Sequence, residues 1–494
     1  KNLKTVIKLH DLTGFDGRCD AIYFTMEAGK MPPSDVKELE AFRRQALGLP
    51  DEAPVAGEYD LVVVGAGIAG MSAAVSAARL GCRVALINDR PVVGGNNSSE
   101  IRVHLGGRIE EGTYKELGGL QKEFGPEKGG NAQPAEYYED QKKMDWLAGE
   151  KNVSLFLNYR AIGVTKEGDK ITSVVVKHIE SGKELKFKAP LFSDCTGDGT
   201  IGYLAGADYR MGREGRDEYG ESIAPEKADK LTMGSSVQWY SVDNKKSSPF
   251  PEFGYGVEFN DKNCEKVMMG EWTWETGMNF DQIKDFERIR DYGMLVVYSN
   301  WSYLKNRMKE NDQYKNRKLG WVAYVAGKRE SRRLMGDYIL KEDDITKNVS
   351  HEDASFATTW SIDLHWQDPK NSEHFPGNEF KAVTKHILIH PYAVPYRCLY
   401  SRNVENLFMA GRNISVTHVA LGTVRVMRTT GMMGEVVGMA ASLCKKYDVT
   451  PRGVYRSHLE DLKTLMKEGV NKKGLPNNQR YNEGGILKDK PVVQ

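Results

Sequence analysis

The chain has 494 residues, and its 69 basic and 68 acidic side chains leave a net charge of +1. Hydrophobic residues make up 40% and charged residues 28%, which is typical of a globular protein and argues against a disordered chain. The balanced charge argues against a nucleic-acid partner, and the glycines that interrupt the most apolar stretch, residues 61–80, argue against a membrane span.

The first 55 residues are expected to form a lead-in segment rather than a domain. Residues 32–47 open with two prolines and an Asp and then place apolar side chains at helical spacing, which predicts one short helix. We expect a cytoplasmic location by default. A periplasmic location stays open, because the chain starts at Lys1 and a signal peptide could have preceded it.

The strongest pattern follows this segment. Four apolar residues at 61–64 are typical of a buried parallel strand, and the sequence GAGIAG comes directly after them at 65–70. A helix pattern then covers about 69–80, and a second apolar strand is expected at 84–87. This strand–turn–helix–strand order is the context in which a G-x-G-x-x-G sequence indicates dinucleotide binding.

The glycines of this turn have separate roles in such a site. Gly65 allows the tight turn, Gly67 lets a pyrophosphate approach the backbone, and Gly70 lets the helix pack closely on the strand. The phosphates then lie at the helix N-terminus, where free N–H groups and the helix dipole favour anions. We therefore assign Gly65, Gly67, Ala69 and Gly70 to the predicted cofactor site.

The end of the second strand departs from the usual pattern. An acidic residue normally accepts hydrogen bonds from the adenosine ribose there, but this chain has Asn88, followed by Asp89 and Arg90. Asn88 keeps an acceptor oxygen without the charge, and Asp89 is an alternative acceptor. The lost charge could also indicate NADP, with Arg90 beside a 2′-phosphate.

Three later segments combine glycines with small polar residues. VVGGNNSSEIRVHLGG, at 92–107, follows the second strand. SDCTGDGT, at 193–200, follows an apolar strand expected at 191–194. LFMAGRNIS, at 407–415, contains a strand end and precedes a helix expected over about 422–444.

These segments, in this order, resemble the bacterial family of FAD-dependent oxidoreductases related to the glutathione reductase structural class. The likeness covers about residues 56–445. It is nearest to a subgroup with GGNNSSE, GxRESRR and AGRxIS…H segments, some of whose members are described as xanthan lyases. The resemblance implies an α/β fold in which a Rossmann-like FAD-binding domain of three-layer ββα type carries an inserted, mixed β-rich substrate domain.

The resemblance also implies domain boundaries and a cofactor site. We expect a lead-in segment at 1–55, a discontinuous FAD domain at 56–110, 150–210 and 400–450, a substrate domain at 111–149 and 211–399, and a C-terminal helix and tail at 451–494. In this class the last glycine segment usually carries an Asp for a ribityl hydroxyl, but this chain has Asn413. Besides the residues above, the implied contacts to non-covalent FAD are Gly95, Asn96, Asn97, Ser98, Arg102, Thr196, Gly197, Asp198, Gly411, Arg412, Asn413 and Gly422.

Hydride transfer between a small organic substrate and flavin N5 needs a proton donor or acceptor nearby, and His is the usual choice. His418 is the first candidate, because it lies between the flavin strand and the following helix, and His104 is the second. For each, a structural hydrogen bond is the alternative. Arg329 and Arg332, in the charged segment 327–340, are candidates for binding a carboxylate or an anionic flavin edge, against the alternative of a solvated helix face.

A second histidine group resembles the family's substrate side: His365, His386 and His390. A spacing of four would give a metal pair only on a helix, and the Ile-Leu-Ile run between His386 and His390 favours a strand. The six cysteines have neither C-x-x-C nor zinc-like spacing, so we predict reduced thiols and no metal. Aromatic residues of the middle region make a carbohydrate-like substrate conceivable: Trp239, Trp272, Trp274, Trp301 and Trp321.

No second G-x-G-x-x-G follows a strand, which argues against an inserted NAD(P)H domain. The sequence therefore predicts an FAD-dependent oxidoreductase, with the substrate, the electron acceptor and the direction of reaction left open. Two alternatives remain: a non-redox flavoprotein acting as a lyase or isomerase, and an NADP-dependent dehydrogenase.

Overall fold

The computed structural model describes residues 4–10, 19 and 21–477, and predictions for the other residues lie outside the described part. Contacts divide the chain into two units, residues 1–52 and 53–494. In the first unit, α1 (Val36–Ala46) begins after Asp35, whose side chain accepts hydrogen bonds from the backbone of Lys37 and Glu38. This N-cap explains why the helix predicted within 32–47 begins only after the prolines.

A five-stranded parallel sheet forms the centre of the second unit, in the order β21–β8–β2–β3–β4. Strands buried on both faces are rich in apolar residues, which is why the runs at 61–64 and 84–87 were recognisable as strands, and why 191–194, which begins with Leu191 and Phe192, was recognisable as well. The strands are β2 (Leu61–Val64), β3 (Val84–Ile87), β4 (Val153–Phe156), β8 (Leu191–Asp194) and β21 (Leu407–Met409).

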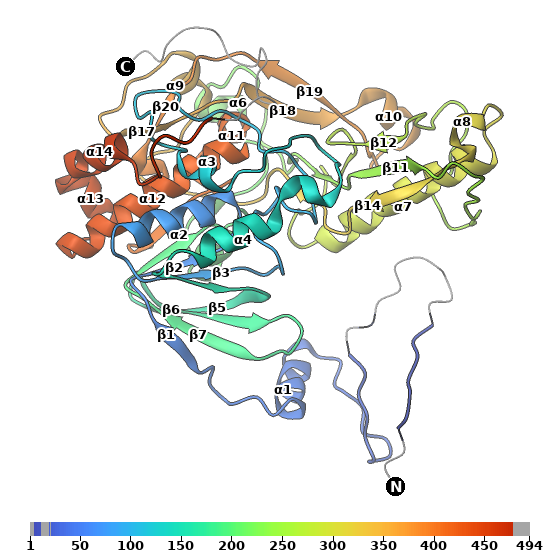
Figure 1. Cartoon of the computed structure of the whole chain (residues 1–494), viewed down its shortest axis with the longest axis horizontal. Helices are drawn as coiled ribbons and strands as arrows, with labels where there is room; N and C mark the ends of the chain where they lie inside the picture. The colour runs from blue at the N-terminus through green and yellow to red at the C-terminus, as the bar shows by residue number, and fades with distance from the viewer. Residues whose placement is uncertain (1–3, 11–18, 20, 478–494) are drawn as a thin grey trace. The chain divides into compact units, whose positions relative to one another are not determined.

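Two helices cover one face of this sheet: α2 (Ile68–Arg79) and α12 (Met427–Tyr447). They lie against each other (Figure 1) because glycines of α12 face α2. A Cβ at Gly434 would lie 2.1 Å from the carbonyl oxygen of Ala69, and a Cβ at Gly438 would lie 2.5 Å from the Cβ of Ser76. These glycines therefore bring the two helices together.

A four-stranded sheet covers the other face, in the order β1–β7–β6–β5. Val62 and Val64 of the parallel sheet share a core with Val174, Val176 and Phe187 of this second sheet. Figure 1 shows the resulting layers, helices, parallel sheet and second sheet, which confirm the predicted three-layer ββα architecture. The strands are β1 (Val55–Glu58), β5 (Tyr159–Glu167), β6 (Lys170–His178) and β7 (Glu184–Lys188).

The region between β8 and β21 consists of small sheets of two or three strands, with long connections. The helix expected over 422–444 is divided into α11 and α12, with Arg425 and Val426 between them. The strand predicted around His386 is present as β19. Whether these small sheets form a separate domain within the predicted boundaries stays a prediction.

The remaining strands are β9 (Tyr209–Arg210), β10 (Ser235–Ser236), β11 (Trp239–Asp243), β12 (Met269–Gly270), β13 (Glu275–Thr276), β14 (Arg317–Val322), β15 (Gly327–Lys328), β16 (Arg333–Leu334), β17 (Ala354–Ala357), β18 (Ile362–Gln367), β19 (Ala382–Ile387) and β20 (Ala393–Pro395). The remaining helices are α3 (Leu120–Phe124), α4 (Asp140–Ala148), α5 (Thr200–Leu204), α6 (Arg216–Tyr219), α7 (Phe286–Asn306), α8 (Asp312–Lys315), α9 (Glu342–Thr346), α10 (Pro369–His374), α11 (His418–Val424), α13 (Pro451–Ser457) and α14 (Leu459–Glu468), with short 3-10 helices η1 (Ala135–Tyr138) and η2 (Tyr396–Cys398).

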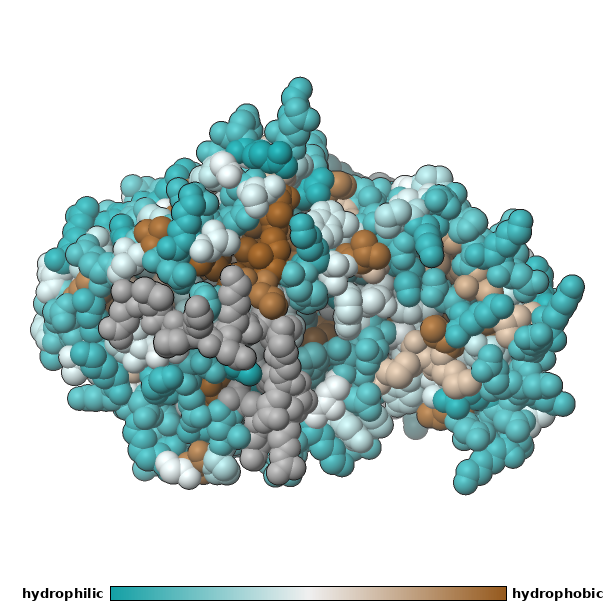
Figure 2. All heavy atoms as spheres, turned by 90° about the horizontal axis from the view of Figure 1, so that it is seen from above, coloured by the Kyte–Doolittle hydropathy of each residue, from teal (hydrophilic) through white to brown (hydrophobic). Residues whose placement is uncertain are grey.

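Hydrophilic residues dominate the face of the molecule seen in Figure 2, and apolar residues appear there as separate small patches. The mean hydropathy of the chain is −0.53. Among the residues that the structure describes, no helix is both long enough and apolar enough to cross a membrane.

Candidate functional site

A cavity of about 550 Å³ lies at the carboxyl ends of the parallel strands. Its walls include Val64 at the end of β2, Asn88 after β3, Cys195 after β8 and Gly411 after β21. Ligands of open α/β sheets bind at this edge, and the volume is within the roughly 300–1,000 Å³ of ligand pockets.

Most of the residues predicted from sequence line this cavity. The lining members of the predicted set are Gly65, Gly67, Ala69, Asn88, Asp89, Arg90, Gly95, Asn96, Ser98, His104, Thr196, Gly197, Asp198, Arg329, Gly411 and Arg412. The others lie behind the lining: Gly70, Asn97, Arg102, Arg332, Asn413, His418 and Gly422.

The glycine-rich turn brings two stretches of backbone into contact where a phosphate would lie. Gly67 forms a bridge with Gly94, and a Cβ at Gly95 would lie 3.1 Å from the Cα of Gly67. Gly65 has a φ of +100°, and a Cβ there would lie 2.3 Å from the carbonyl oxygen of Cys195. Side chains would therefore fill this cradle, which opens beside the N-terminus of α2, where the helix dipole favours an anion.

Asn88 is used differently from the acidic residue it replaces. Its Oδ1 accepts a hydrogen bond from the backbone N–H of Ala66 (3.1 Å), and its Nδ2 donates to the carbonyl oxygens of Arg90 and Val92. Asn88 therefore holds the turn together. Asp89 lines the cavity and is exposed, which makes it the better placed acceptor for a ribose hydroxyl.

The guanidinium of Arg90 is already paired and is not available to bind a 2′-phosphate. Its Nε lies 3.0 Å from Oε2 of Glu100, and both side chains are only partly exposed. A phosphate at this point would have to compete with that carboxylate, so the ion pair weighs against the NADP alternative.

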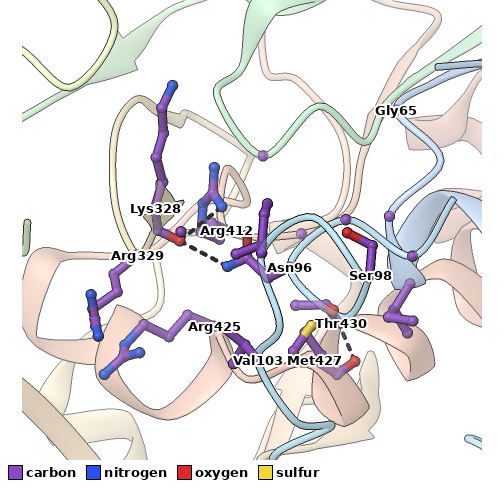
Figure 3. Close-up of a pocket in the computed structure, with 18 of the residues that line it drawn as sticks. Gly65, Asn96, Ser98, Val103, Lys328, Arg329, Arg412, Arg425, Met427 and Thr430 are labelled. Atoms are coloured by element: carbon purple, nitrogen blue, oxygen red, sulfur yellow. Dashed lines mark hydrogen bonds between the residues drawn. The ribbon is translucent and has the colours of Figure 1, made fainter. Parts of the chain in front are cut away.

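Basic side chains converge on Asp198 in the middle of the cavity wall. Lys328 Nζ lies 2.6 Å and Arg412 Nη2 lies 3.1 Å from its carboxylate oxygens. Burial raises the pKa of Asp198, but the charges of Lys328 and Arg412 outweigh burial and lower that pKa to about 2. Figure 3 shows Asn96 and Arg412 both hydrogen-bonded to the carbonyl oxygen of Lys328. The loop of residues 94–97 (the GGNN loop), β15 and the turn after β21 therefore form one wall.

The N-terminus of α12 forms another part of the wall. Val426, Met427 and Thr430 line the cavity, and the backbone N–H of Arg428 donates to the carbonyl oxygen of Gly106. The positive ends of α2 and α12 therefore face the same space, so both stabilise negative charge on a bound group.

Charged side chains from separate segments meet at another part of the wall. Asp363 and His365 of β18 and Arg425 after α11 line the cavity, and Glu275 of β13 lies buried behind them. His365 Nδ1 is 2.6 Å from Glu275 Oε2, and Arg425 Nη2 is 2.9 Å from Asp363 Oδ2. Sequence reasoning had grouped His365 and His386 but missed Asp363, Arg425 and Glu275, which stand in no recognisable motif.

Both carboxylates of this group are held in the charged form. Burial raises the pKa of Glu275, but Arg329 and the hydrogen bond from His365 outweigh burial and lower it to about 2. Burial likewise raises the pKa of Asp363, and the charge of Arg425 brings it below its usual range. The cavity wall therefore carries fixed negative as well as positive groups.

His104 lines the cavity on its loop after β3, as predicted. Its Nδ1 is 2.9 Å from Oδ1 of Asn131. Burial lowers the pKa of His104, so its imidazole is neutral near pH 7 and able to accept a proton.

His418 is a correction to the predicted catalytic set. It is 3% exposed and begins α11, behind the cavity wall. Its Nδ1 lies 2.9 Å from Oε2 of Glu330, and its backbone N–H donates to Glu214. The alternative of a structural hydrogen bonder therefore describes His418, because carboxylates that need a buried partner surround it.

Arg332 also lies outside the lining. Its guanidinium stacks over the ring of Tyr203 at 3.9 Å and of Tyr209 at 5.5 Å, both exposed. The charged segment around it forms no helix, because it consists of β15, β16 and the turn between them. A solvated helix face is thus the wrong description of residues 327–340.

Four residues predicted to contact the cofactor do not line the cavity, and they contact other parts of the chain behind its wall instead. Asn97 donates to the carbonyl oxygen of Val103, and Asn413 donates to that of Asp194. Arg102 donates to two carbonyl oxygens, and its guanidinium stacks on Trp321. Gly422 admits β18: a Cβ there would lie 2.8 Å from the backbone nitrogen of Asp363.

The tryptophans do not form one aromatic platform. Trp239 packs edge-on against Trp274 and Trp301, and all three are buried. Trp272 lines the cavity, together with Trp360, which had not been singled out. No group of His, Cys, Asp and Glu side chains in the described part of the chain could hold a metal ion.

Lys143 of α4 supports the GGNN loop from behind. This role was not predicted from the sequence. Lys143 is fully buried, and its Nζ donates to the carbonyl oxygens of Asn97 (2.6 Å) and Tyr138. Burial lowers its pKa to about 8. Lys143 is therefore a positioning residue for the loop that carries Asn96 and Ser98.

We expect Lys143→Met to weaken cofactor binding about tenfold, because a charge-assisted hydrogen bond to a loop contributes about 1.5–3 kcal/mol. Flavin fluorescence during titration of the apoprotein measures the dissociation constant. The control is Lys142→Met, since Lys142 donates to Gly125 and Glu139 instead and is more exposed. Equal affinities of the two variants would contradict the assigned role.

The family described as FAD dependent oxidoreductase matches residues 60–466 of the chain. No curated protein matches it by sequence. One similar solved structure is a geranylgeranyl bacteriochlorophyll reductase-like protein from Thermoplasma acidophilum, with 14% identity, a TM-score of 0.35 and coverage of 83% of each chain. Another is a myxobacterial chondrochloren halogenase, described as FAD-dependent, with 13% identity, a TM-score of 0.35 and coverage of 83% of this chain and 79% of that one.

Proposed function

Because the chain belongs to the family of FAD dependent oxidoreductases, we propose that its cavity holds FAD without a covalent link, beside a small organic substrate. The observation that carries this proposal is the cradle of Gly67 and Gly95 at the N-terminus of α2. Two further groups support the fit. Ser98 Oγ and Arg412 Nε are buried in the wall without a hydrogen-bond partner among the described residues, so a bound polar group would satisfy them.

When bound, FAD supplies a two-electron acceptor or donor for hydride transfer. The residues of the chain supply binding and proton movement. His104 is neutral near pH 7, so it offers a nitrogen for proton exchange with a substrate, whereas both nitrogens of His365 are held by partners, Glu275 and Arg425. Arg329, which lies 3.4 Å from Glu275, keeps that buried carboxylate charged.

A hydroxyl-bearing, carbohydrate-like substrate agrees with the polar atoms of the wall. Asp363 Oδ1 and Gln238 Oε1 are buried acceptors without a hydrogen-bond donor among the described residues. A hydroxyl group satisfies such acceptors, and the indole rings of Trp272 and Trp360 offer apolar surface beside them. We also propose that the chain belongs to the glutathione reductase structural class, within the subgroup some of whose members are described as xanthan lyases. The sequence motifs support this assignment.

The test is the absorption spectrum of the purified protein before and after denaturation. We expect flavin bands that pass into the supernatant when the protein is precipitated by heat. A colourless protein that takes up no added FAD would overturn the proposal. Flavin that stays attached to the precipitate would contradict non-covalent binding alone.

A further inference from the structure

His365 is held by its two closest neighbours, an anion at Nδ1 and a cation at Nε2, and Asp363 Oδ1 lies 3.4 Å from Nε2. Its Nδ1 lies 2.6 Å from Oε2 of Glu275, and its Nε2 lies 3.0 Å from Nη2 of Arg425. His365 and Glu275 are 6% and 0% exposed, so bulk water does not replace these contacts. The two neighbours therefore determine where the proton of the imidazole lies.

A guanidinium group has donors and no acceptor. Nε2 of His365 must consequently accept from Arg425, which leaves the proton on Nδ1, where Glu275 accepts it. In this arrangement the lone pair is on Nε2, and Arg425 covers it. His365 can take up a proton only when Arg425 turns away from Nε2.

Arg425 is bonded unevenly. Its Nη2 has two hydrogens but lies within hydrogen-bond distance of three acceptors: His365 Nε2, Asp363 Oδ2 (2.9 Å) and the Asp363 carbonyl oxygen (3.1 Å). Its Nε is buried in the cavity wall and has no partner among the described residues. The guanidinium is therefore short of acceptors on its Nε side, which a planar pair of oxygens would supply.

The charges around His365 balance. The positive charges of Arg425 and Arg329 pair with the negative charges of Asp363 and Glu275, respectively. Figure 3 shows both arginine side chains extending to the same side of the cavity. Other groups that face this cluster are His386, whose Nε2 is 3.7 Å from Asp363, the indole N–H of Trp360, which donates to Asp363 Oδ2 (3.1 Å), and the ring of Trp272, 5.5 Å from His365. One additional negative charge would be balanced if His365 took up one proton.

We propose that this part of the cavity binds the carboxylate of an organic acid through Arg425, and that binding uncovers Nε2 of His365 and gives it a proton. The proposal rests on the proposed function and narrows its substrate to a hydroxy acid, of which a sugar acid is the carbohydrate-like case. Nε2 takes its proton from the solvent when the acid lacks a hydroxyl group.

The test uses the FAD-bound protein with acetate as the probe and glycerol as an uncharged, hydroxyl-bearing comparison. Changes in the flavin spectrum report the dissociation constant. Calorimetry in two buffers of different ionisation enthalpy reports the protons taken up. We expect acetate to bind with uptake of a proton from the solvent, and glycerol to bind without it.

Variants separate the binding of the carboxylate from the protonation of His365. Arg425→Met should keep its flavin and weaken acetate binding about tenfold or more, with Arg425→Lys between it and the unmodified protein. His365→Gln should bind acetate without proton uptake. Arg402→Met is the matched control, because Arg402 forms an exposed ion pair with Asp208 and lies outside the cavity lining.

Acetate binding that is absent, or unchanged in Arg425→Met and Arg425→Lys, would overturn the inference. Proton uptake that persists in His365→Gln would overturn it as well. Each of these results is obtained with flavin-containing protein, so the proposed function would stand. Loss of flavin from the unmodified protein would instead remove the proposed function.

Discussion

Gly67→Asp is expected to yield a folded protein that contains no FAD. Gly67 is the N-cap of α2, with a φ of −67° and a ψ of −178°, which an Asp adopts without strain and which it favours as a capping residue. A Cβ there would meet only the Cα of Gly95, at 3.9 Å. The fold should therefore tolerate the substitution, and the helix should gain a cap.

The same carboxylate would occupy the phosphate cradle. Its negative charge would satisfy the N–H groups and the dipole that otherwise favour the pyrophosphate, and would repel the phosphate oxygens at contact distance. The affinity for FAD, measured by flavin fluorescence during titration, should fall by about a hundredfold or more, since one lost contact and one repulsion amount to about 3 kcal/mol or more, and the purified variant should lose its flavin.

The matched control is Gly254→Asp, which adds the same charge at an exposed position with no atom within 4 Å of the new Cβ. We expect it to retain a full complement of flavin. Circular dichroism and thermal unfolding verify that Gly67→Asp is folded. Normal flavin content in folded Gly67→Asp would remove the cradle from the cofactor site.

Arg333→Met is expected to produce the largest loss of stability among the substitutions considered. Arg333 is 1% exposed; it pairs with Glu330 and Glu214 and donates to the carbonyl oxygens of Gly212 and Val416. Methionine has a similar length and no charge. The substitution would leave two buried carboxylates without their guanidinium: Glu330 would keep its contact with the His418 imidazole, and Glu214 its hydrogen bond from the His418 backbone N–H.

Removing one partner of a buried ion pair costs about 3–5 kcal/mol, because the remaining charge has no solvent to stabilise it. The midpoint of denaturant unfolding measures this loss. Arg402→Met serves again as the control, since its ion pair with Asp208 is nearly half exposed and contributes only about 0–1 kcal/mol. Similar midpoints for the two variants would mean that the cluster around Arg333 is not an important source of stability.

Local features of this protein were predictable from sequence. The run at 61–64, the GAGIAG turn and the following helix are contiguous, so the interactions that form them depend on neighbours in the chain. The phosphate cradle is nearly as local, because only α2, β3 and their turns separate Gly67 from Gly95 along the chain. The α/β class followed from these patterns, and so did the place that we propose for the cofactor.

The roles of His418 and His365 were not predictable in this way. Both histidines stand next to strands or helix starts, and nothing in their own segments distinguishes a structural residue from a cavity residue. His418 is turned inward by Glu330, 88 residues earlier, and His365 is oriented by Glu275, 90 residues earlier. Pairings at such separations depend on how the small sheets pack and leave no periodic signal in the sequence.

The sequence by itself therefore determined the dinucleotide-binding unit, because short-range turn geometry and buried-strand composition specify it. Only the tertiary structure decided which charged side chains face the cavity. Burial makes an unpaired charge costly, so each buried Arg, Glu and His takes the partner that the packing brings near. That requirement placed His418 in a structural cluster and assembled Glu275, Asp363, His365 and Arg425 at the cavity wall.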